Sequence, residues 1–184
     1  MPEIGVATPL FGSQVRPVTT PAWQEAWNLR IDVLDIEHRE LMEILNALDE
    51  RFTSHPGGQD QVMGEADGLC QEAMDEREVS VEHTVLIAAL DRLGERARDH
   101  FQHEEAFMRS IDYPDLGAHR CEHALLHAEY VEMVRNLKHQ PITQLDPETV
   151  TALRRWLVGH MLAADKEYAN YYFAWLEQQE EHAR

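Results

Sequence analysis

Cysteine is scarce in this sequence of 184 residues. Only Cys70 and Cys121 are present, and no two cysteines have the CxxC spacing. Two thiols suffice for one disulfide, but nothing in their placement favours it, so we expect a reducing, cytoplasmic environment. The lack of a ligand-like cysteine pair also argues against a structural zinc site built on thiolates.

Positive charge and long apolar runs are scarce as well. The chain has 16 Lys and Arg against 34 Asp and Glu, which gives a formal net charge of -18 at pH 7. Such a charge disfavours nucleic acid and anionic membrane surfaces as partners. No stretch approaches the ~20 apolar residues of a membrane span. Residues 1–20 lack the basic region and apolar run of a signal peptide. From the charge and the absence of a long apolar run, we expect no nucleic-acid and no membrane partner.

Four stretches carry apolar residues at spacings of three and four, which predicts four helices. We expect them over about residues 35–52, 81–110, 115–138 and 146–178. The first would bury Ile36 and Leu41 on one face, and the last would open with Asp146 as N-cap and Pro147 as first helical residue. Four helices, two of them joined by short turns, predict an all-α fold, an up-down-up-down four-helix bundle.

Two segments lie outside this pattern. Prolines recur through residues 1–22, which predicts an extended N-terminal arm before a bundle domain over residues 23–184. Trp23 and Trp27 are expected to pack where the arm meets the bundle. Glycines interrupt residues 55–80, an insertion between the first two helices with room for a short acidic helix. A cap on the bundle, a partner surface and an acidic loop all remain open for it, and a protein partner would use this insertion or the arm.

Histidine, by contrast, is abundant, with eleven residues. In the predicted helices some of them align with each other or with a carboxylate: His-x-x-x-Glu and His-x-x-x-His place both side chains on one helix face. A further His-x-x-x-x-Asp pair would be separated by about 140° on an ideal helix, so we expect a π-type turn there, or side chains that reach in from each flank. The seven candidate metal ligands are His38, His100, Glu104, His119, His123, His160 and Asp165.

Each spacing alone is weak, because eleven histidines produce chance pairs. Taken together, in order and on four helices, they predict a dinuclear metal site in the bundle core. Five imidazoles with two carboxylates suit iron better than calcium or magnesium, which prefer oxygen ligands, while manganese remains open. Two carboxylates can bridge two cations, and redox-active iron with an open coordination position can bind dioxygen.

At these residues the chain resembles the bacterial hemerythrin-like proteins. The resemblance covers roughly residues 23–175 and implies a non-haem di-iron centre that binds dioxygen reversibly, for carriage, storage or delivery. Its motifs are residues 36–41 (IEHREL), 100–108 (HFQHEEAFM), 113–115 (YPD), 119–123 (HRCEH), 156–160 (WLVGH) and 165–166 (DK).

The resemblance also implies a role for each ligand. One iron would be held by three imidazoles, from His119, His123 and His160. The second iron would be held by His38 and His100 and would keep a vacant position for dioxygen. Both irons would be bridged by Glu104, Asp165 and an oxo or hydroxo group.

Apolar residues beside the ligands would line a dioxygen pocket in this resemblance. They are Leu41, Phe101 and Leu157, for which ordinary core packing is an equally good explanation. A dry pocket would slow oxidation to an inert ferric state.

Two other functions stay open beside dioxygen carriage: an oxygen or redox sensor that signals through a partner, and a di-iron peroxidase or oxidase. No output domain is recognisable, which favours the carrier. Catalysis would need a polar acid or base near the open position, and only apolar residues are expected there. His103 and Glu105 have a helical phase that turns them away from the pair at 100 and 104. We therefore expect a binding protein and no enzyme.

Overall fold

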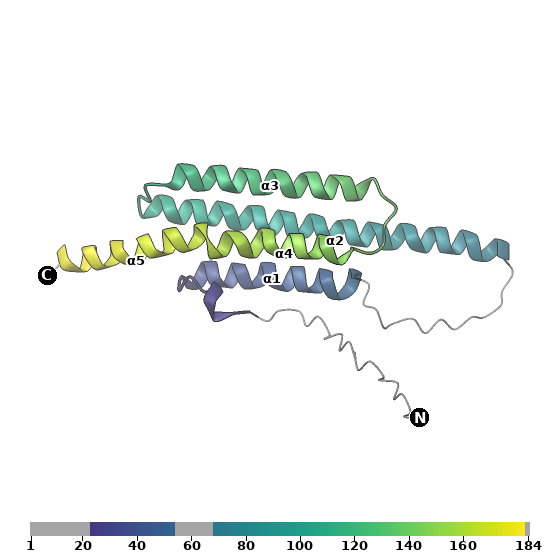
Figure 1. Cartoon of the computed structure of the whole chain (residues 1–184), viewed down its shortest axis with the longest axis horizontal. Coiled ribbons are helices and arrows are strands. Elements are labelled where there is room, and N and C mark those ends of the chain that lie inside the picture. The colour runs from purple at the N-terminus through teal and green to yellow at the C-terminus, as the bar shows by residue number, and fades with distance from the viewer. Residues whose placement is uncertain (1–22, 54–67, 183–184) are drawn as a thin grey trace, which may run out of the picture.

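The computed structural model describes residues 23–53 and 68–182, and it describes side chains for residues 23–53 and 79–182. Within these ranges the chain forms helices and no strand, which confirms the predicted all-α bundle. Figure 1 shows the long helices side by side, with the last helices of the chain following one another along one rod. The elements are the 3-10 helix η1 (Glu25–Trp27) and the α-helices α1 (Asp32–Phe52), α2 (Gly68–Ser110), α3 (Leu116–Lys138), α4 (Pro147–Leu162) and α5 (Ala164–His182).

The start of α4 follows the predicted signals. Asp146 caps α4: its carboxylate accepts the backbone N–H of Thr149 at 2.8 Å, and Pro147 occupies the first helical position. The connection between α2 and α3 is short and contains Asp112 with a positive φ of 52°. In the described part of the chain, no helix combines the length and the apolar composition that a membrane span requires.

The second helix is longer than the sequence predicted. Its start was expected near residue 81 but lies at Gly68, so residues 68–80 continue α2 and form no separate short helix. Figure 1 shows this part of α2 running on beyond the end of the bundle. The rest of the predicted insertion, residues 54–67, and the predicted arm, residues 1–22, lie outside the described residues.

The fourth rod is broken where a widened π-type turn was expected, so that prediction is wrong. Helix α4 ends at Leu162, and Ala163 has φ -106° and ψ -85°. The N–H of Ala163 bonds the carbonyl oxygen of His160, a closure over three residues that is tighter than an α-turn. Helix α5 then starts at Ala164, so the interruption of the helix resets the direction of Asp165.

Two apolar clusters fill the bundle on either side of a buried polar layer. Leu41 and Ala97 belong to one cluster, and Leu34 and Met108 belong to the other. The order along α1 is therefore opposite to the order along α2, as antiparallel neighbours require. The polar layer is made by the residues that lie between the clusters on each helix. Histidines and carboxylates in this layer are enclosed by apolar side chains at both ends.

Two packing predictions have different outcomes. The side chain of Trp27 is 5 % exposed and lies edge-to-face against Trp23 at 5.7 Å between ring centroids, so both pack at the start of the bundle as expected. Ile36, predicted to be in the core, is 51 % exposed. The buried face of α1 carries the polar residues Asp35 and His38 instead, so the apolar period misplaced it by one position.

Candidate metal centre

The seven predicted ligands converge in the buried layer. They come from α1, α2, α3, the end of α4 and the start of α5, and none is more than 5 % exposed. Their ligand atoms form two groups, each with all atoms within 4.8 Å of one another. One group is His38, His100, Glu104 and Asp165, and the other is Glu104, His119, His123, His160 and Asp165. Both groups contain the same two carboxylates.

The Glu104 carboxylate faces both groups at once. Its Oε1 lies 3.4 Å from Nε2 of His100 and 3.7 Å from Nε2 of His38. Its Oε2 lies 3.2 Å from Nε2 of His123 and 4.0 Å from Nε2 of His119. One oxygen of Glu104 therefore points to each group.

Asp165 divides its oxygens in the same way. Oδ2 lies 3.4 Å from Nε2 of His38, whereas Oδ1 lies 3.1 Å from Nε2 of His160 and 3.5 Å from Nε2 of His119. The break at Ala163 makes this possible, because His160 and Asp165 are five residues apart and an unbroken α-helix would turn one of them away.

The donor atoms have the chemistry of a cation site. Among the described residues, several inward-facing atoms are buried and make no hydrogen bond: Nε2 of His38, His100 and His119, Oε2 of Glu104, and both carboxylate oxygens of Asp165. The Nε2 atoms of His123 and His160 face each other at 2.9 Å. Buried polar atoms without partners are costly, and a bound cation would satisfy all of them. The residues present thus fit a metal centre.

Protonation takes the place of a cation when none is bound. Burial lowers the pKa of His160, but Asp165 and Glu104 outweigh burial and raise it to about 9. Burial raises the pKa of Asp165, but the close approach of His160 and His38 holds it well below its usual range. The site therefore keeps negative carboxylates beside the protonated imidazole of His160, and a metal would displace that proton.

Charged side chains surround the ligands, which corrects the expectation of apolar residues alone. Glu37 and Glu105 lie next to ligands in sequence and contact imidazoles of neighbouring helices: Oε2 of Glu37 lies 2.9 Å from Nδ1 of His100, and Oε1 of Glu105 lies 3.2 Å from Nδ1 of His123. Although Glu105 turns away from its own pair as predicted, it reaches a ligand of α3. These contacts join different helices, so spacing within one helix did not find them.

The Glu37 carboxylate is shared by two imidazoles. His103, whose side chain is 57 % exposed, approaches Oε1 of Glu37 with its Nδ1 at 2.6 Å. Burial raises the pKa of Glu37, but the hydrogen bonds from His100 and His103 outweigh it and lower the pKa to about 2. An ionised carboxylate can only accept, so His100 donates its Nδ1–H and turns a lone pair on Nε2 toward the site.

Tyr168 is a further residue that the sequence did not single out. Its side chain is fully buried, and its hydroxyl donates to Oε1 of Glu104 at 2.5 Å. Burial, followed by the charge of Glu104, raises the pKa of Tyr168 well above its usual range, so the hydroxyl stays a donor. In the sequence Tyr168 is one more apolar-period position of the fourth helix, and no spacing signal marks it.

The three predicted pocket residues are all buried. Leu41, Phe101 and Leu157 are 0 %, 5 % and 3 % exposed. Phe101 stacks on the His123 ring with 4.0 Å between centroids and planes 13° apart. A surface groove of about 480 Å³ between α2 and α3 reaches Phe101 and His123. Phe101 and the ligand His123 therefore both line this groove.

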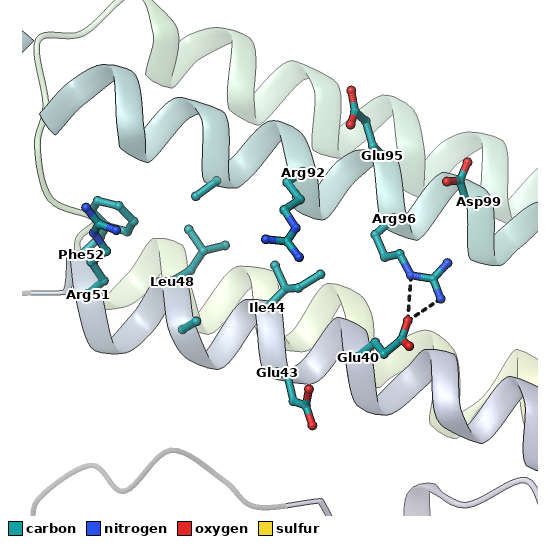
Figure 2. A pocket seen from close by; sticks show the side chains of 12 residues that line it. Glu40, Glu43, Ile44, Leu48, Arg51, Phe52, Arg92, Glu95, Arg96 and Asp99 are labelled. Carbon is teal, nitrogen blue, oxygen red and sulfur yellow. Dashed lines mark hydrogen bonds and ion pairs between the residues drawn. The ribbon is translucent and has the colours of Figure 1, made fainter. Parts of the chain in front are cut away.

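A larger groove of about 790 Å³ lies between α1 and α2, and none of the seven ligands lines it. Figure 2 shows Arg96 of α2 reaching across it to Glu40 of α1, with Nη2 to Oε2 at 2.5 Å. The same Arg96 Nη2 lies 3.5 Å from Oε1 of Glu37. Arg96 thus connects this groove to Glu37, whose carboxylate contacts the ligand His100.

Known proteins resemble the chain over most of its length. A family model described as the hemerythrin HHE cation binding domain matches residues 29–172. A bacteriohemerythrin of Stenotrophomonas maltophilia is 29 % identical over 156 residues, which cover 85 % of this chain and 84 % of that protein. A bacteriohemerythrin of Clostridium acetobutylicum is 26 % identical over 155 residues, covering 79 % of this chain and 96 % of that protein.

A shorter match and a structural match agree with these relatives. A myohemerythrin of Theromyzon tessulatum is 32 % identical over 79 residues, which are 43 % of this chain and 59 % of that protein. Among solved structures, a crystal structure of a hemerythrin variant superposes with a TM-score of 0.60. It is 19 % identical and covers 82 % of this chain and 95 % of that chain, so it supports the fold alone.

Proposed function

Because the chain belongs to the hemerythrin family, we propose that it binds dioxygen reversibly at a non-haem di-iron centre, for carriage, storage or delivery. One observation carries the proposal: the two groups of donor atoms share Glu104 and Asp165, and each carboxylate turns one oxygen to each group. Two cations joined by two carboxylates need this arrangement, whereas a single cation needs only one group.

The ligands divide between the two irons in this proposal. His38 and His100 would hold one iron, which has fewer imidazoles and thus a coordination position left for dioxygen. The other iron would be held by His119, His123 and His160. Glu104 and Asp165 would bridge the two. When bound, the iron pair would supply the electrons that reversible dioxygen binding requires.

The surrounding residues would orient the ligands and exclude water. Tyr168 fixes one oxygen of Glu104 by its hydrogen bond. Leu41, Phe101 and Leu157 are the buried apolar residues that would keep the dioxygen position dry. Five imidazoles suit iron, and metal analysis decides between iron and manganese. We also propose a cytoplasmic location, and a protein partner would act through the arm or the insertion.

The proposal is tested by metal analysis and an anaerobic-to-aerobic optical titration of one sample. We expect two irons per chain, a new absorption on exposure to dioxygen, and its loss when dioxygen is removed. An absorption that never reverses would contradict reversible binding. A sample that holds manganese and no iron would contradict the choice of metal.

A peroxidase remains the second candidate because charged residues and Tyr168 lie beside the ligands, where only apolar residues were expected. Adding hydrogen peroxide and a reducing dye to the iron-loaded protein separates the two functions. Steady turnover of the dye would favour the enzyme, and a single stoichiometric change would favour the carrier.

A further inference from the structure

Three of the five ligand imidazoles are held from behind by a glutamate of the preceding helix. Glu37 of α1 contacts His100 of α2, with Oε2 2.9 Å from Nδ1. Glu105 of α2 contacts His123 of α3, with Oε1 3.2 Å from Nδ1.

The third contact repeats the arrangement on the next pair of helices. Glu122 of α3 contacts His160 of α4, with Oε1 3.1 Å from Nδ1. The three contacts thus follow the chain around the bundle, from α1 to α2, α2 to α3, and α3 to α4. We call Glu37, Glu105 and Glu122 the outer glutamates.

Each outer glutamate is also a sequence neighbour of a ligand. Glu37 precedes His38, Glu105 follows Glu104, and Glu122 precedes His123. Adjacent residues on a helix are rotated by about 100°, so when the ligand points into the bundle its neighbour points toward the adjoining helix. Each of the first three helices therefore supplies both a ligand and a carboxylate that reaches the ligand of the next.

Hydrogen bonding to a carboxylate changes what an imidazole offers to a metal. The carboxylate accepts the Nδ1–H, which fixes the tautomer with its lone pair on Nε2 and raises the basicity of the ligand. It also adds a negative charge close to the centre. Both effects stabilise ferric iron more than ferrous iron, because the ferric ion carries the larger charge.

The three outer glutamates differ in exposure. The side chain of Glu37 is 9 % exposed, that of Glu105 is 20 % exposed and that of Glu122 is 47 % exposed. Water screens a charge more strongly as its exposure rises, so the influence on the iron should decrease in the same order.

Further side chains contact the outer glutamates on the side away from the ligands. Arg96 and His103 both approach Oε1 of Glu37, and Nε of Arg120 lies 3.0 Å from Oε2 of Glu105. These groups sit nearer to solvent: the side chains of Arg96, His103 and Arg120 are 26 %, 57 % and 57 % exposed. These side chains hold the glutamates in place, but water screens their charges more strongly than it screens the contacts between glutamates and ligands. The effect on the iron should therefore still decrease from Glu37 to Glu105 to Glu122.

We propose that Glu37, Glu105 and Glu122 are positioning residues that orient His100, His123 and His160 and stabilise the ferric state of the iron centre, with Glu37 the most effective. This inference rests on the proposed iron centre. It concerns the reduction potential and the metal retention of that centre, and an assay of reversible dioxygen binding measures neither.

Substitution by glutamine separates charge from shape. In Glu37→Gln one acceptor oxygen remains for His100, while His103 is exposed and can turn to water. The midpoint potential of the iron-loaded protein, from a reductive titration with mediators, should rise in Glu37→Gln, rise less in Glu105→Gln and least in Glu122→Gln. The matched control is Glu43→Gln, which makes the same charge change at an exposed position of α1 and should leave the potential at the wild-type value.

Removal of the acceptor gives a second readout. Glu37→Ala should weaken metal retention by about 10–100-fold, measured as iron lost to a chelator, because partners behind a ligand typically contribute that much. Glu43→Ala should lose iron at the wild-type rate. If Glu37→Gln or Glu37→Ala fails to fold, the midpoint potentials of Glu105→Gln and Glu122→Gln, compared with that of the control, still test the inference.

Three results are informative. Equal shifts in all four glutamine variants, or none in any, would overturn the inference even if wild type binds dioxygen reversibly. The predicted order in a protein whose dioxygen absorption does not reverse would support the inference and contradict the proposed function. A wild-type protein that holds no iron would remove both.

Discussion

Glu104 shows how much one buried residue does in this site. Its two oxygens lie 3.2 to 4.0 Å from imidazole nitrogens of three helices, and one of them also accepts the hydroxyl of Tyr168. A carboxylate so enclosed is costly unless positive charge compensates it. The imidazoles supply this compensation when they carry protons, and a metal would supply it when they do not.

Loss of one imidazole should therefore weaken metal binding. We expect His123→Ala to lower iron affinity about tenfold or more and to remove any iron absorption near the blue edge of the visible. The matched control is His127→Ala, one turn further along α3 and outside both donor groups. Normal iron and dioxygen binding by His123→Ala would show that the ligand assignment is wrong.

Phe101 should protect the centre from water. Phe101→Ala removes the ring stacked on His123, and we expect it to cost about 3–5 kcal/mol of unfolding free energy. It should also speed the irreversible oxidation of the dioxygen-exposed protein, followed as loss of reversible absorption. Phe101→Leu stays apolar and should be milder in both measurements. Unchanged oxidation in Phe101→Ala would remove Phe101 from the proposed pocket.

Residue spacing predicted the ligands but not their supports. His119 and His123 are four apart on one helix, so periodicity alone brings them together. Glu122 lies beside His123 but contacts His160, 38 residues away, and that contact depends on how α3 packs on α4. Local periodicity contains no information on such contacts between helices. Tyr168 occupies an apolar-period position, so the sequence predicted a core residue and not a hydrogen-bond donor.

At the scale of helices, the packing of α2 on α3 at Gly94 depends on the absence of a side chain. A Cβ at Gly94 would lie 2.5 Å from Cε1 of Tyr130, whose hydroxyl is anchored to the carbonyl oxygen of Leu90 at 2.5 Å. A glycine inside a helix normally weakens it. The absent side chain of Gly94 instead lets the two helices pack.

Two glycine substitutions should have opposite effects. Gly94→Ala should destabilise by about 1–2 kcal/mol, because crowding against Tyr130 exceeds the gain in helix propensity. Gly159→Ala, in α4 with nothing within 4 Å of the added Cβ, should stabilise by up to about 1 kcal/mol. Urea unfolding measures both, and stabilisation by Gly94→Ala would show that the helices can separate at low cost.

The sequence predicted where helices lie more reliably than it predicted where a helix is interrupted. Apolar periods and the Asp146 cap located the bundle helices, but the segment around Ala163 contains no glycine or proline to announce a break. The spacing of His160 and Asp165 did require some distortion. The form of this distortion depends on the surrounding packing. The sequence therefore predicted that the helix is distorted here, but it wrongly predicted a π-type turn where the helix is broken.

The whole molecule places the donors between two apolar clusters. The extension of α2 seen in Figure 1 lies at the end of the bundle remote from the α2–α3 connection, near which the donors sit. The metal centre should therefore be independent of that extension.

A deletion tests this independence. Removal of residues 57–78 should leave iron content and dioxygen binding unchanged, because none of the seven donors lies there and the described contacts of the site are made by residues outside this segment. Metal analysis and the optical titration measure both. Loss of iron would show that the segment supports the core, and loss of a partner without loss of iron would favour the sensor.

The arrangement of two metals around shared carboxylates is tested most directly by Mössbauer spectroscopy of the fully iron-loaded, oxidised protein. We predict two irons per chain and the signature of a magnetically coupled ferric pair. A spectrum of isolated ferric ions, or a loading that stops at one iron per chain, would contradict the account.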